Sequence, residues 1–224
     1  MNTELARFNM IEQQIRPWEV LDQSVLSLLA TLRREDFVPP AMRALAFVDT
    51  TVPLVAGDPG GPCMLEPKVE ARLLQELQVQ RHEKVLEIGT GSGFMAALLA
   101  HRAQQVYTLE CRPALARMAR ESLHRNGVLN VQVLDVDAPQ GAQGLPAEAP
   151  FDAIVLSGSV AEVPRHLLEQ LKAGGRLAAI VGDEPVMRAR LYTRVGAAAW
   201  SATDLFDTVA PRLEGFAEPS RFTF

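Results

Sequence analysis

A run of alternating glycines directly after a short apolar segment constrains this chain more than any other feature. The segment 85–88 is typical of a buried strand, Gly89, Gly91 and Gly93 follow at every second position, and a helical pattern begins at Phe94. Glycine lets the backbone turn sharply and approach a ligand without an intervening Cβ. The sequence therefore predicts a nucleotide-type crevice between a strand and a helix.

Strand and helix patterns alternate along the rest of the chain. We expect strands at 85–88, 105–109, 131–134, 153–156 and 176–181, with helices at 94–102, 113–126 and 164–171. Such alternation is typical of a parallel sheet covered on both faces. Two more strand patterns, at 188–195 and 202–209, have no helix between them and predict an antiparallel hairpin. The predicted fold is α/β, with a doubly wound, mostly parallel sheet of seven strands.

The segment before the sheet is predicted to form a helical extension. Apolar residues recur at helical spacing over 4–34 with a break at Pro17, and Asp22 is a suitable N-cap for the second helix. Another helix is expected at 67–77. The cluster Gly-Asp-Pro-Gly-Gly-Pro at 57–62 is the densest group of turn formers and predicts a loop.

Length and composition fit one globular domain. The chain has 224 residues, of which 48% are hydrophobic and 22% charged, so it can bury a substantial core. We expect a single domain over 1–224, with the helical extension and a substrate-side loop at 1–62 and the ligand-binding core at 63–224.

Charge and cysteine content argue against several classes of function. The net charge is −5 and the basic residues are scattered, so we do not expect a nucleic-acid partner. Cys63 and Cys111 have no C-x-x-C spacing and no His pair accompanies them, so no metal site is expected. A charged N-terminus and the lack of an apolar run of ~18 residues predict a cytoplasmic protein without a membrane partner. Nothing in the sequence sets an oligomeric state.

The glycine loop favours one cofactor over two others. A dinucleotide fingerprint needs a small residue where Phe94 stands, and a P-loop needs a Gly-Lys-Ser/Thr sequence that is absent. S-adenosylmethionine has no phosphate but carries an ammonium and a sulfonium. A carboxylate beside the loop, here Glu87, suits those cations and would repel a pyrophosphate. The pattern therefore predicts S-adenosylmethionine as cofactor.

Two further carboxylates follow the next two predicted strands. Glu110 stands about ~20 residues beyond the loop, where an acidic side chain can accept from ribose hydroxyls. Asp137 is a candidate acceptor for an adenine amino group. Each feature alone could be a tight turn, a solvated strand end or a helix cap, but together they mark the ends of three consecutive strands. The predicted cofactor-binding residues are Glu87, Gly89, Thr90, Gly91, Ser92, Gly93, Glu110, Asp137 and Ala138.

At this point the sequence resembles the protein-L-isoaspartate O-methyltransferase family. The resemblance rests on Arg-Glu-Asp-Phe-Val-Pro at 34–39, the loop at 85–93, Pro-Phe-Asp-Ala-Ile-Val at 150–155 and the segment 168–177. It implies transfer of a methyl group from S-adenosylmethionine to the carboxylate of isoaspartyl residues in damaged proteins, with S-adenosylhomocysteine as product. An ionised carboxylate is already a nucleophile, so the enzyme mainly has to align two atoms.

The loop before the cofactor site departs from the family pattern. The family sequence Gly-Gln-Thr-Ile-Ser-x-Pro aligns with 61–67, where only the first Gly and the last Pro match. The family's active-site serine falls on Leu65, which has no hydroxyl. We therefore assign no catalytic residue, and we take Cys63, Met64, Leu65 and Ser157 as the substrate-side candidates.

Three functions remain open from the sequence. The first is the isoaspartyl carboxyl methyltransferase that the resemblance implies. The second is a methyltransferase of the same fold acting on a small molecule or RNA, motivated by Leu65 and the altered loop. The third is a non-catalytic protein that keeps the fold and the cofactor, because a fold does not fix a function.

Overall fold

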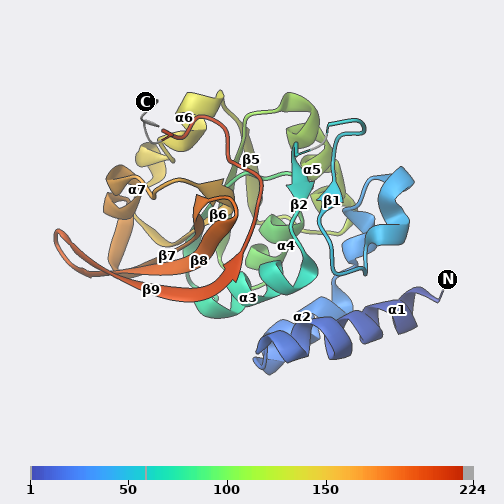
Figure 1. Ribbon diagram of the computed structural model, residues 1–224. Coiled ribbons are helices and arrows are strands. Elements are labelled where there is room, and N and C mark those ends of the chain that lie inside the picture. Colours follow the sequence, from blue (N-terminus) through green and yellow to red (C-terminus); the bar gives the residue numbers. More distant parts are fainter. Residues whose placement is uncertain (1, 59, 219–224) are drawn as a thin grey trace.

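A seven-stranded sheet lies at the centre of the molecule (Figure 1). The computed structural model describes residues 2–58 and 60–218. The strand order is β5-β4-β3-β6-β7-β8-β9; neighbours from β5 to β7 run parallel, and β7, β8 and β9 are antiparallel. The strands are β3 (Lys84–Ile88), β4 (Gln105–Glu110), β5 (Val131–Asp135), β6 (Phe151–Val160), β7 (Leu171–Asp183), β8 (Val186–Gly196) and β9 (Ala199–Thr208). The predicted fold class, the seven strands and the C-terminal hairpin are confirmed.

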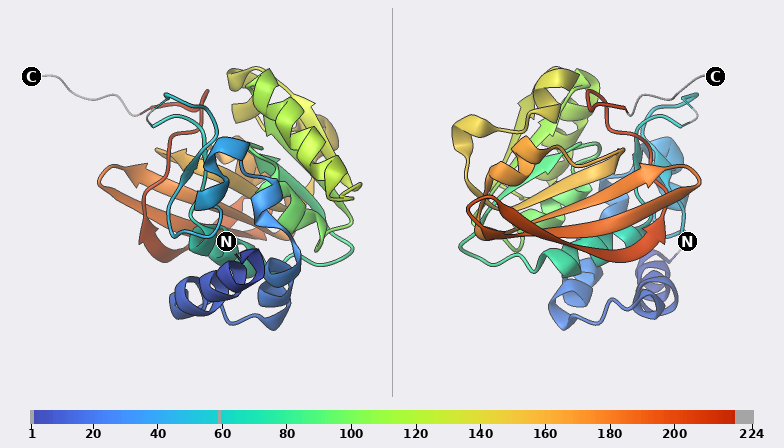
Figure 2. Two further views of the ribbon diagram at one scale, coloured as in Figure 1. Left: turned by 90° about the vertical axis from the view of Figure 1, so that its right-hand side faces the viewer. Right: turned by 60° about the vertical axis from the view of Figure 1, so that its left-hand side comes forward.

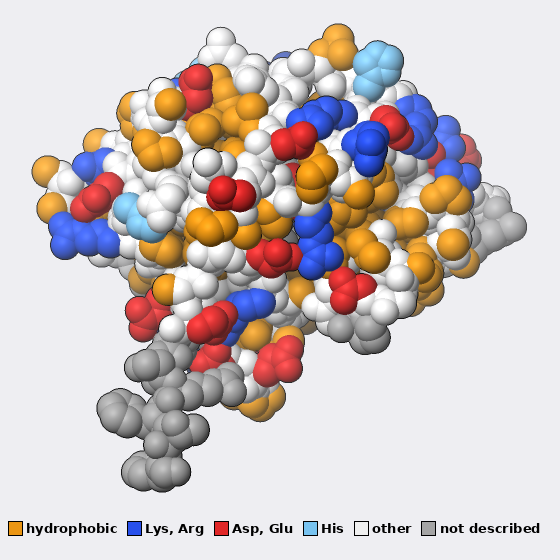
Figure 3. Space-filling view, turned by 90° about the horizontal axis from the view of Figure 1, so that it is seen from above, with side chains coloured by type: hydrophobic (Ala, Val, Ile, Leu, Met, Phe, Trp, Pro, Cys, Tyr) orange, Lys and Arg blue, Asp and Glu red, His pale blue; other side chains and the backbone are white. Residues whose placement is uncertain are grey.

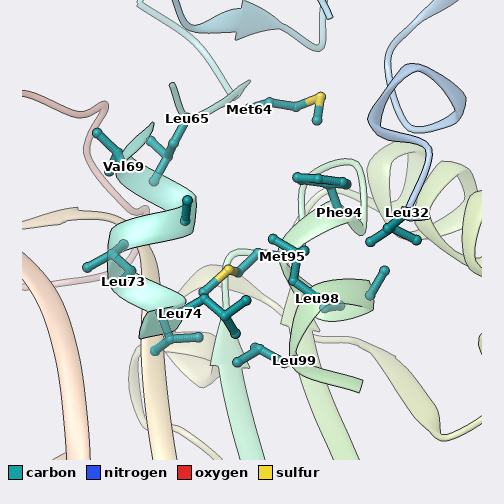
Figure 4. Packing of buried hydrophobic residues seen from close by; sticks show 14 of the residues in the cluster. Leu32, Met64, Leu65, Val69, Leu73, Leu74, Phe94, Met95, Leu98 and Leu99 are labelled. Carbon is teal, nitrogen blue, oxygen red and sulfur yellow. The ribbon is translucent and has the colours of Figure 1, made fainter. Parts of the chain in front are cut away.

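Helices cover both faces of this sheet (Figure 2). One face carries α3 (Pro67–Leu77), α4 (Phe94–Ala100) and α5 (Pro113–Arg125), and α7 (Arg165–Glu169) packs on the other. The α3 and α4 helices contact each other, and Leu74 of α3 lies near Met95 and Leu99 of α4 (Figure 4).

Alternating side chains of the central strands supply two separate cores. On β3, Val85 belongs to the core beneath α3, α4 and α5, whereas Leu86 belongs to the core beneath α7. On β6, Val155 and Ile154 divide in the same way. A strand buried on both faces reads as a continuous apolar run because successive side chains point to opposite sides.

Two helices, α7 and α6, differ from the sequence-based expectation. The helix expected at 164–171 ends at Glu169, because Leu171 already pairs with Phe151 as the first residue of β7. A short helix, α6 (Ala138–Ala142), follows β5 and was not predicted. Its five residues contain a proline and a glycine, which indicate a loop in the sequence.

The helical extension is confirmed and is irregular at its break. α1 (Thr3–Met10) continues into a π-helical turn and a 3₁₀ turn that contains Pro17, and α2 (Gln23–Thr31) follows. Asp22 caps α2 as predicted, since its Oδ1 accepts from the Ser24 amide at 2.8 Å. Within the described residues no helix combines the length and apolar character that a membrane span requires.

A small antiparallel pair flanks the predicted loop. It joins β1 (Val52–Pro53) to β2 (Cys63–Met64), so the turn formers between them project from a fixed base. Pro59, within the loop predicted at 57–62, lies outside the described residues. The loop lies beside the carboxyl ends of β4, β3 and β6. The strand order reverses at β3, and open α/β sheets bind ligands at such a switch point.

Candidate functional site

A cavity of about 460 Å³ opens at the carboxyl ends of β3, β4 and β6. Its walls come from the glycine loop, the β4–α5 and β5–α6 connections, the loop before α3, and the chain after β9. A space of this size lies within the range of small-ligand and cofactor sites. The switch point of the sheet is therefore hollow, as the sequence predicted.

The glycine loop adopts backbone conformations that favour glycine. Gly89 has φ 93°, Gly91 φ 53° and Gly93 φ 85°. Gly89 and Gly91 line the cavity, so a ligand can approach their backbone directly. Gly93 has a packing role instead, because a Cβ there would lie 3.2 Å from the Cβ of Ala119 on α5.

Glu110 lies at the cavity as the ribose prediction requires. Its Oε2 accepts from the Gly91 amide at 2.8 Å and its Oε1 from the Arg112 amide at 3.0 Å. Burial raises the pKa of this carboxyl, and the amide donors partly oppose that shift. The side chain is 6% exposed and borders the cavity. A ribose contact by Glu110 stays a prediction.

The β5–α6 connection presents backbone and small side chains to the cavity. Val136, Ala138 and Gly141 line it. Asp137 is exposed and caps α6, with Oδ1 accepting from the Gln140 amide at 2.7 Å. The capping role is the alternative that the sequence left open, and an adenine contact by Asp137 stays a prediction.

Glu87 lies behind the glycine loop rather than on the wall of the main cavity. It is 0% exposed and borders a smaller cavity with Thr90, Ser92 and Met64. Ser157 Oγ donates to its Oε1 at 2.7 Å, and the Thr108 hydroxyl donates to its Oε2 at 2.7 Å. Burial raises the pKa of Glu87 to about 8, and the two hydroxyl donors only partly offset this.

The substrate-side candidates converge on the same end of the sheet. Cys63, Leu65 and Ser157 line both the main and the smaller cavity, and Met64 lines the smaller one. Burial, reinforced by the nearby Glu70 carboxylate, raises the pKa of Cys63 to about 11, so this side chain is a thiol at neutral pH. Leu65 is buried and brings an apolar surface to the wall.

Arg34 supports this wall and was missed as a site residue by sequence reasoning. It is 1% exposed, donates from Nη2 to the Leu65 carbonyl at 2.7 Å and forms a buried ion pair with Glu70. Its guanidinium also lies 4.8 Å from the ring centroid of Phe94. Arg34 is the first residue of the motif at 34–39. That motif indicated the family resemblance but no role for Arg34 in the site.

The chain after β9 forms a further wall that no sequence pattern indicated. The Ser159 amide donates to the Pro211 carbonyl at 2.8 Å, and the Leu213 amide donates to the Ser159 carbonyl at 2.9 Å. Leu213 packs against the glycine loop, since a Cβ on Gly89 would lie 2.7 Å from Leu213 Cδ2. This segment therefore crosses the carboxyl ends of the strands.

Arg112 links the two walls across the cavity rim. Its Nη1 lies 3.3 Å from Asp58 Oδ2 in the loop, and its Nη2 lies 2.7 Å from Glu214 Oε1 in the C-terminal segment. Within the described part of the chain no three His, Cys, Asp or Glu side chains are placed to hold a metal ion.

A family model decides the relationship. The model for protein-L-isoaspartate(D-aspartate) O-methyltransferase matches residues 6–208. The chain belongs to this family. As a member it is an S-adenosylmethionine-dependent methyltransferase.

Individual relatives agree with the family match. The chain is 41% identical over 176 residues to a protein-L-isoaspartate O-methyltransferase of Methanoculleus marisnigri, covering 79% of this chain and 77% of the relative. It is 37% identical over 203 residues to one of Koribacter versatilis, covering 91% and 88%. The family model's match to 6–208 includes most of the helical extension and the altered loop as well as the cofactor core.

Solved structures support the fold. A putative protein-L-isoaspartate O-methyltransferase from Plasmodium falciparum, in complex with S-adenosyl-L-homocysteine, superposes with a TM-score of 0.77 at 17% identity, over 96% of this chain and 99% of that one. Another protein-L-isoaspartate O-methyltransferase gives a TM-score of 0.75 at 21% identity, over 97% of this chain and 66% of that one.

Proposed function

We propose that this methyltransferase transfers the methyl group of S-adenosylmethionine to the carboxylate of isoaspartyl residues in proteins. The observation that carries the proposal is the chemistry of the cavity wall. Among the described residues that line it there is no His or Lys. Asp58 and Glu214 are paired with Arg112, and the Glu110 carboxylate accepts from two backbone amides. A wall without a free base suits an acceptor that is already ionised, and a carboxylate is one.

We infer a task for each group of residues on the cavity walls. Glu110 and the backbone of Gly89 and Gly91 would hold the cofactor, with Asp137 and Ala138 at its adenine end. Cys63, Leu65 and Ser157 would face the acceptor. S-adenosylmethionine supplies the electrophilic methyl group when bound. The protein binds and aligns the two partners, and it excludes water from the space between the loop and the C-terminal segment.

This proposal also implies a domain organisation, an acceptor and a cellular location. Residues 1–224 would act as one domain, with 1–62 shaping the acceptor side and 63–224 holding the cofactor. The acceptor would be a protein or peptide with a damaged aspartyl or asparaginyl site, and we place the enzyme in the cytoplasm. Two cysteines with raised pKa values, both unpaired, fit a reducing compartment.

A small-molecule carboxylate is the second candidate acceptor. Leu65, Pro62, Pro211 and Leu213 make the acceptor side of the wall apolar, which suits a compact organic acid. RNA is less well supported. Over the face in Figure 3, which includes the ends of the loop and α6, Lys and Arg side chains are interspersed with Asp and Glu rather than gathered in a stripe.

Transfer of a labelled methyl group tests the choice of acceptor. The panel contains an isoaspartyl peptide, the same peptide with normal aspartate, a set of small organic acids and an RNA pool. We expect label on the isoaspartyl peptide alone. Label on organic acids but not on the peptide would overturn the proposal in favour of the second candidate, and binding of cofactor without any transfer would support a non-catalytic role.

A further inference from the structure

Ser157 is the one side-chain hydroxyl on the wall of the main cavity among the described residues. It stands where β6 leaves its neighbours: pairing with β3 ends at Leu156, and pairing with β7 is irregular between Val155 and Ser159. Irregularities of this kind re-aim a side chain next to a site. Ser157 lines both the main and the smaller cavity at this irregular point of β6.

The partner of this hydroxyl is a buried acid without a cation. Ser157 Oγ lies 2.7 Å from Glu87 Oε1, and Thr108 donates to the other oxygen. Among the described residues no Lys, Arg or His pairs with Glu87. The titratable groups that face it are Glu70 on α3, Glu110 at the end of β4 and Cys63 in the loop. Arg34 is engaged by Glu70, so its charge does not compensate Glu87.

We propose that Ser157 donates its hydrogen to the acceptor carboxylate and that protonated Glu87 orients it to do so. This inference rests on the proposed function. A hydroxyl has one proton. When Glu87 is ionised, that proton is directed to Oε1 and is not available to the cavity. When Glu87 carries its own proton on Oε1, it donates to Ser157 Oγ, and the hydroxyl proton of Ser157 turns toward the acceptor.

The protonation states allow this arrangement over a defined pH range. Burial raises the pKa of Glu87 to about 8, so the acid is protonated at neutral pH. An aspartyl-type acceptor ionises near a pKa of about 4, so it is a carboxylate at the same pH. A protonated Glu87 also removes a negative charge that would repel the acceptor. Ser157 is then a binding residue, and Glu87 is a positioning residue.

Other charged groups at the cavity do not replace this donor. Arg112 is paired with Asp58 and Glu214. Arg212 is engaged by Asp183 and donates to the Gly182 carbonyl at 2.7 Å. Leu65, which lines the same cavities, has no polar atom in its side chain. An incoming carboxylate therefore finds its side-chain hydroxyl donor at Ser157.

The test measures the KM for an isoaspartyl peptide between pH 6 and 9.5, at saturating S-adenosylmethionine. For the unaltered enzyme we expect KM to rise about five- to tenfold between pH 7 and 9, because Glu87 ionises and takes the Ser157 proton. Ser157→Ala should raise KM at pH 7 about tenfold, because the acceptor carboxylate loses one charge-assisted hydrogen bond. The KM of this variant should not change with pH. Ser157→Thr keeps the hydroxyl and should restore the pH-dependent profile.

Two more variants test whether Glu87 orients the Ser157 hydroxyl or only packs against it. Glu87→Gln places a permanent N–H donor beside Ser157, so it should keep KM low and abolish its rise above pH 8. Leu65→Ser combined with Ser157→Ala moves the hydroxyl to position 65, which lines the same cavities. This double variant should have a KM at least about threefold lower than that of Ser157→Ala alone. Thermal unfolding checks that each variant is folded.

The outcomes distinguish this inference from the proposed function. A KM for Ser157→Ala within twofold of the unaltered enzyme, or a pH-dependent rise that persists in Glu87→Gln, would overturn the role of Ser157 while leaving isoaspartyl methylation intact. Glu87→Gln carries the test alone if Ser157→Ala does not fold. Absence of transfer to the isoaspartyl peptide by the unaltered enzyme at every pH would overturn both.

Discussion

The guanidinium of Arg34 holds the main-chain carbonyl of Leu65 at 2.7 Å while pairing with the buried carboxylate of Glu70. One side chain of the helical extension thus fixes the acceptor wall to the first turn of α3. Arg34 also lies over the ring of Phe94, the first residue after the glycine loop. The acceptor wall and the cofactor loop therefore rest on a common support.

Removing this support should destabilise the fold. Arg34→Met leaves Glu70 as an uncompensated buried charge, and we expect the free energy of unfolding to fall by about 3–5 kcal/mol. Arg34→Met combined with Glu70→Leu should recover most of the loss, because no buried charge remains. Denaturant unfolding measures both.

Arg33 provides the matched control for this pair. Its side chain is 62% exposed and lies 3.3 Å from Glu35. Arg33→Met should change the unfolding free energy by less than about 1 kcal/mol, because the Arg33 side chain is mostly exposed and the buried Glu35 carboxylate keeps its ion pair with Arg7 at 2.6 Å. Equal effects of the Arg33 and Arg34 substitutions would contradict the account.

Replacing Glu110 should weaken cofactor binding. The carboxylate accepts from two backbone amides and borders the cavity, and a neutral amide can accept from only one of those donors at a time. We expect Glu110→Gln to raise the Kd for S-adenosylmethionine by about 10- to 100-fold, measured by calorimetry. Asp135→Asn, at the exposed end of the neighbouring strand, is the control and should leave Kd unchanged.

A methyl group on Gly89 should damage both packing and the site. The residue has φ 93°, and its added Cβ would lie 2.7 Å from Leu213 Cδ2 and project into the cavity wall. We expect Gly89→Ala to lose about 1–3 kcal/mol of stability and most cofactor affinity. Gly57 has a similar φ of 76° but no atom within 4 Å of an added Cβ, so Gly57→Ala isolates the backbone strain. Similar losses in both variants would show that the contact with Leu213 is unimportant.

Stability should fall as pH rises because of Glu87. Its pKa is raised from 4.5 to about 8 in the folded state, so the folded protein binds more protons than the unfolded chain between those values. The contribution is fully present below about pH 4.5 and is lost as pH rises through about 8. Glu87→Gln should remove this fall of stability between about pH 4.5 and 8. It should also raise Tm at pH 8.5 by at least about 2–4 °C. The exposed Glu121, changed to Gln, should leave the slope as it was.

The sequence predicted those parts of the fold that depend on local patterns. The apolar runs of β3 and β6 are continuous because both faces are buried, and the glycines after β3 are needed where the backbone turns and a ligand approaches. Asp22 was identified as an N-cap because its side chain bonds within its own turn. Such features are determined by residues that are close together in the sequence.

Features that depend on distant contacts escaped the sequence. Arg34 reaches Glu70 across 36 positions, and the spacing gives no sign of the pairing. Leu213 packs on Gly89 only because the hairpin returns the chain to the switch point. Glu87 accepts from Ser157 and Thr108, two partners that its position in the sequence did not indicate, and its contact with the cofactor stays a prediction. The partner that determines each role comes from another element.

The most direct test is tandem mass spectrometry of an isoaspartyl peptide after incubation with the enzyme and S-adenosylmethionine, beside its normal aspartyl twin. The account predicts one methyl ester on the free carboxylate of the isoaspartyl residue, none on the twin, and calorimetric cofactor binding that Glu110→Gln weakens. Cofactor binding at the unaltered site with no ester on the isoaspartyl peptide would contradict the account.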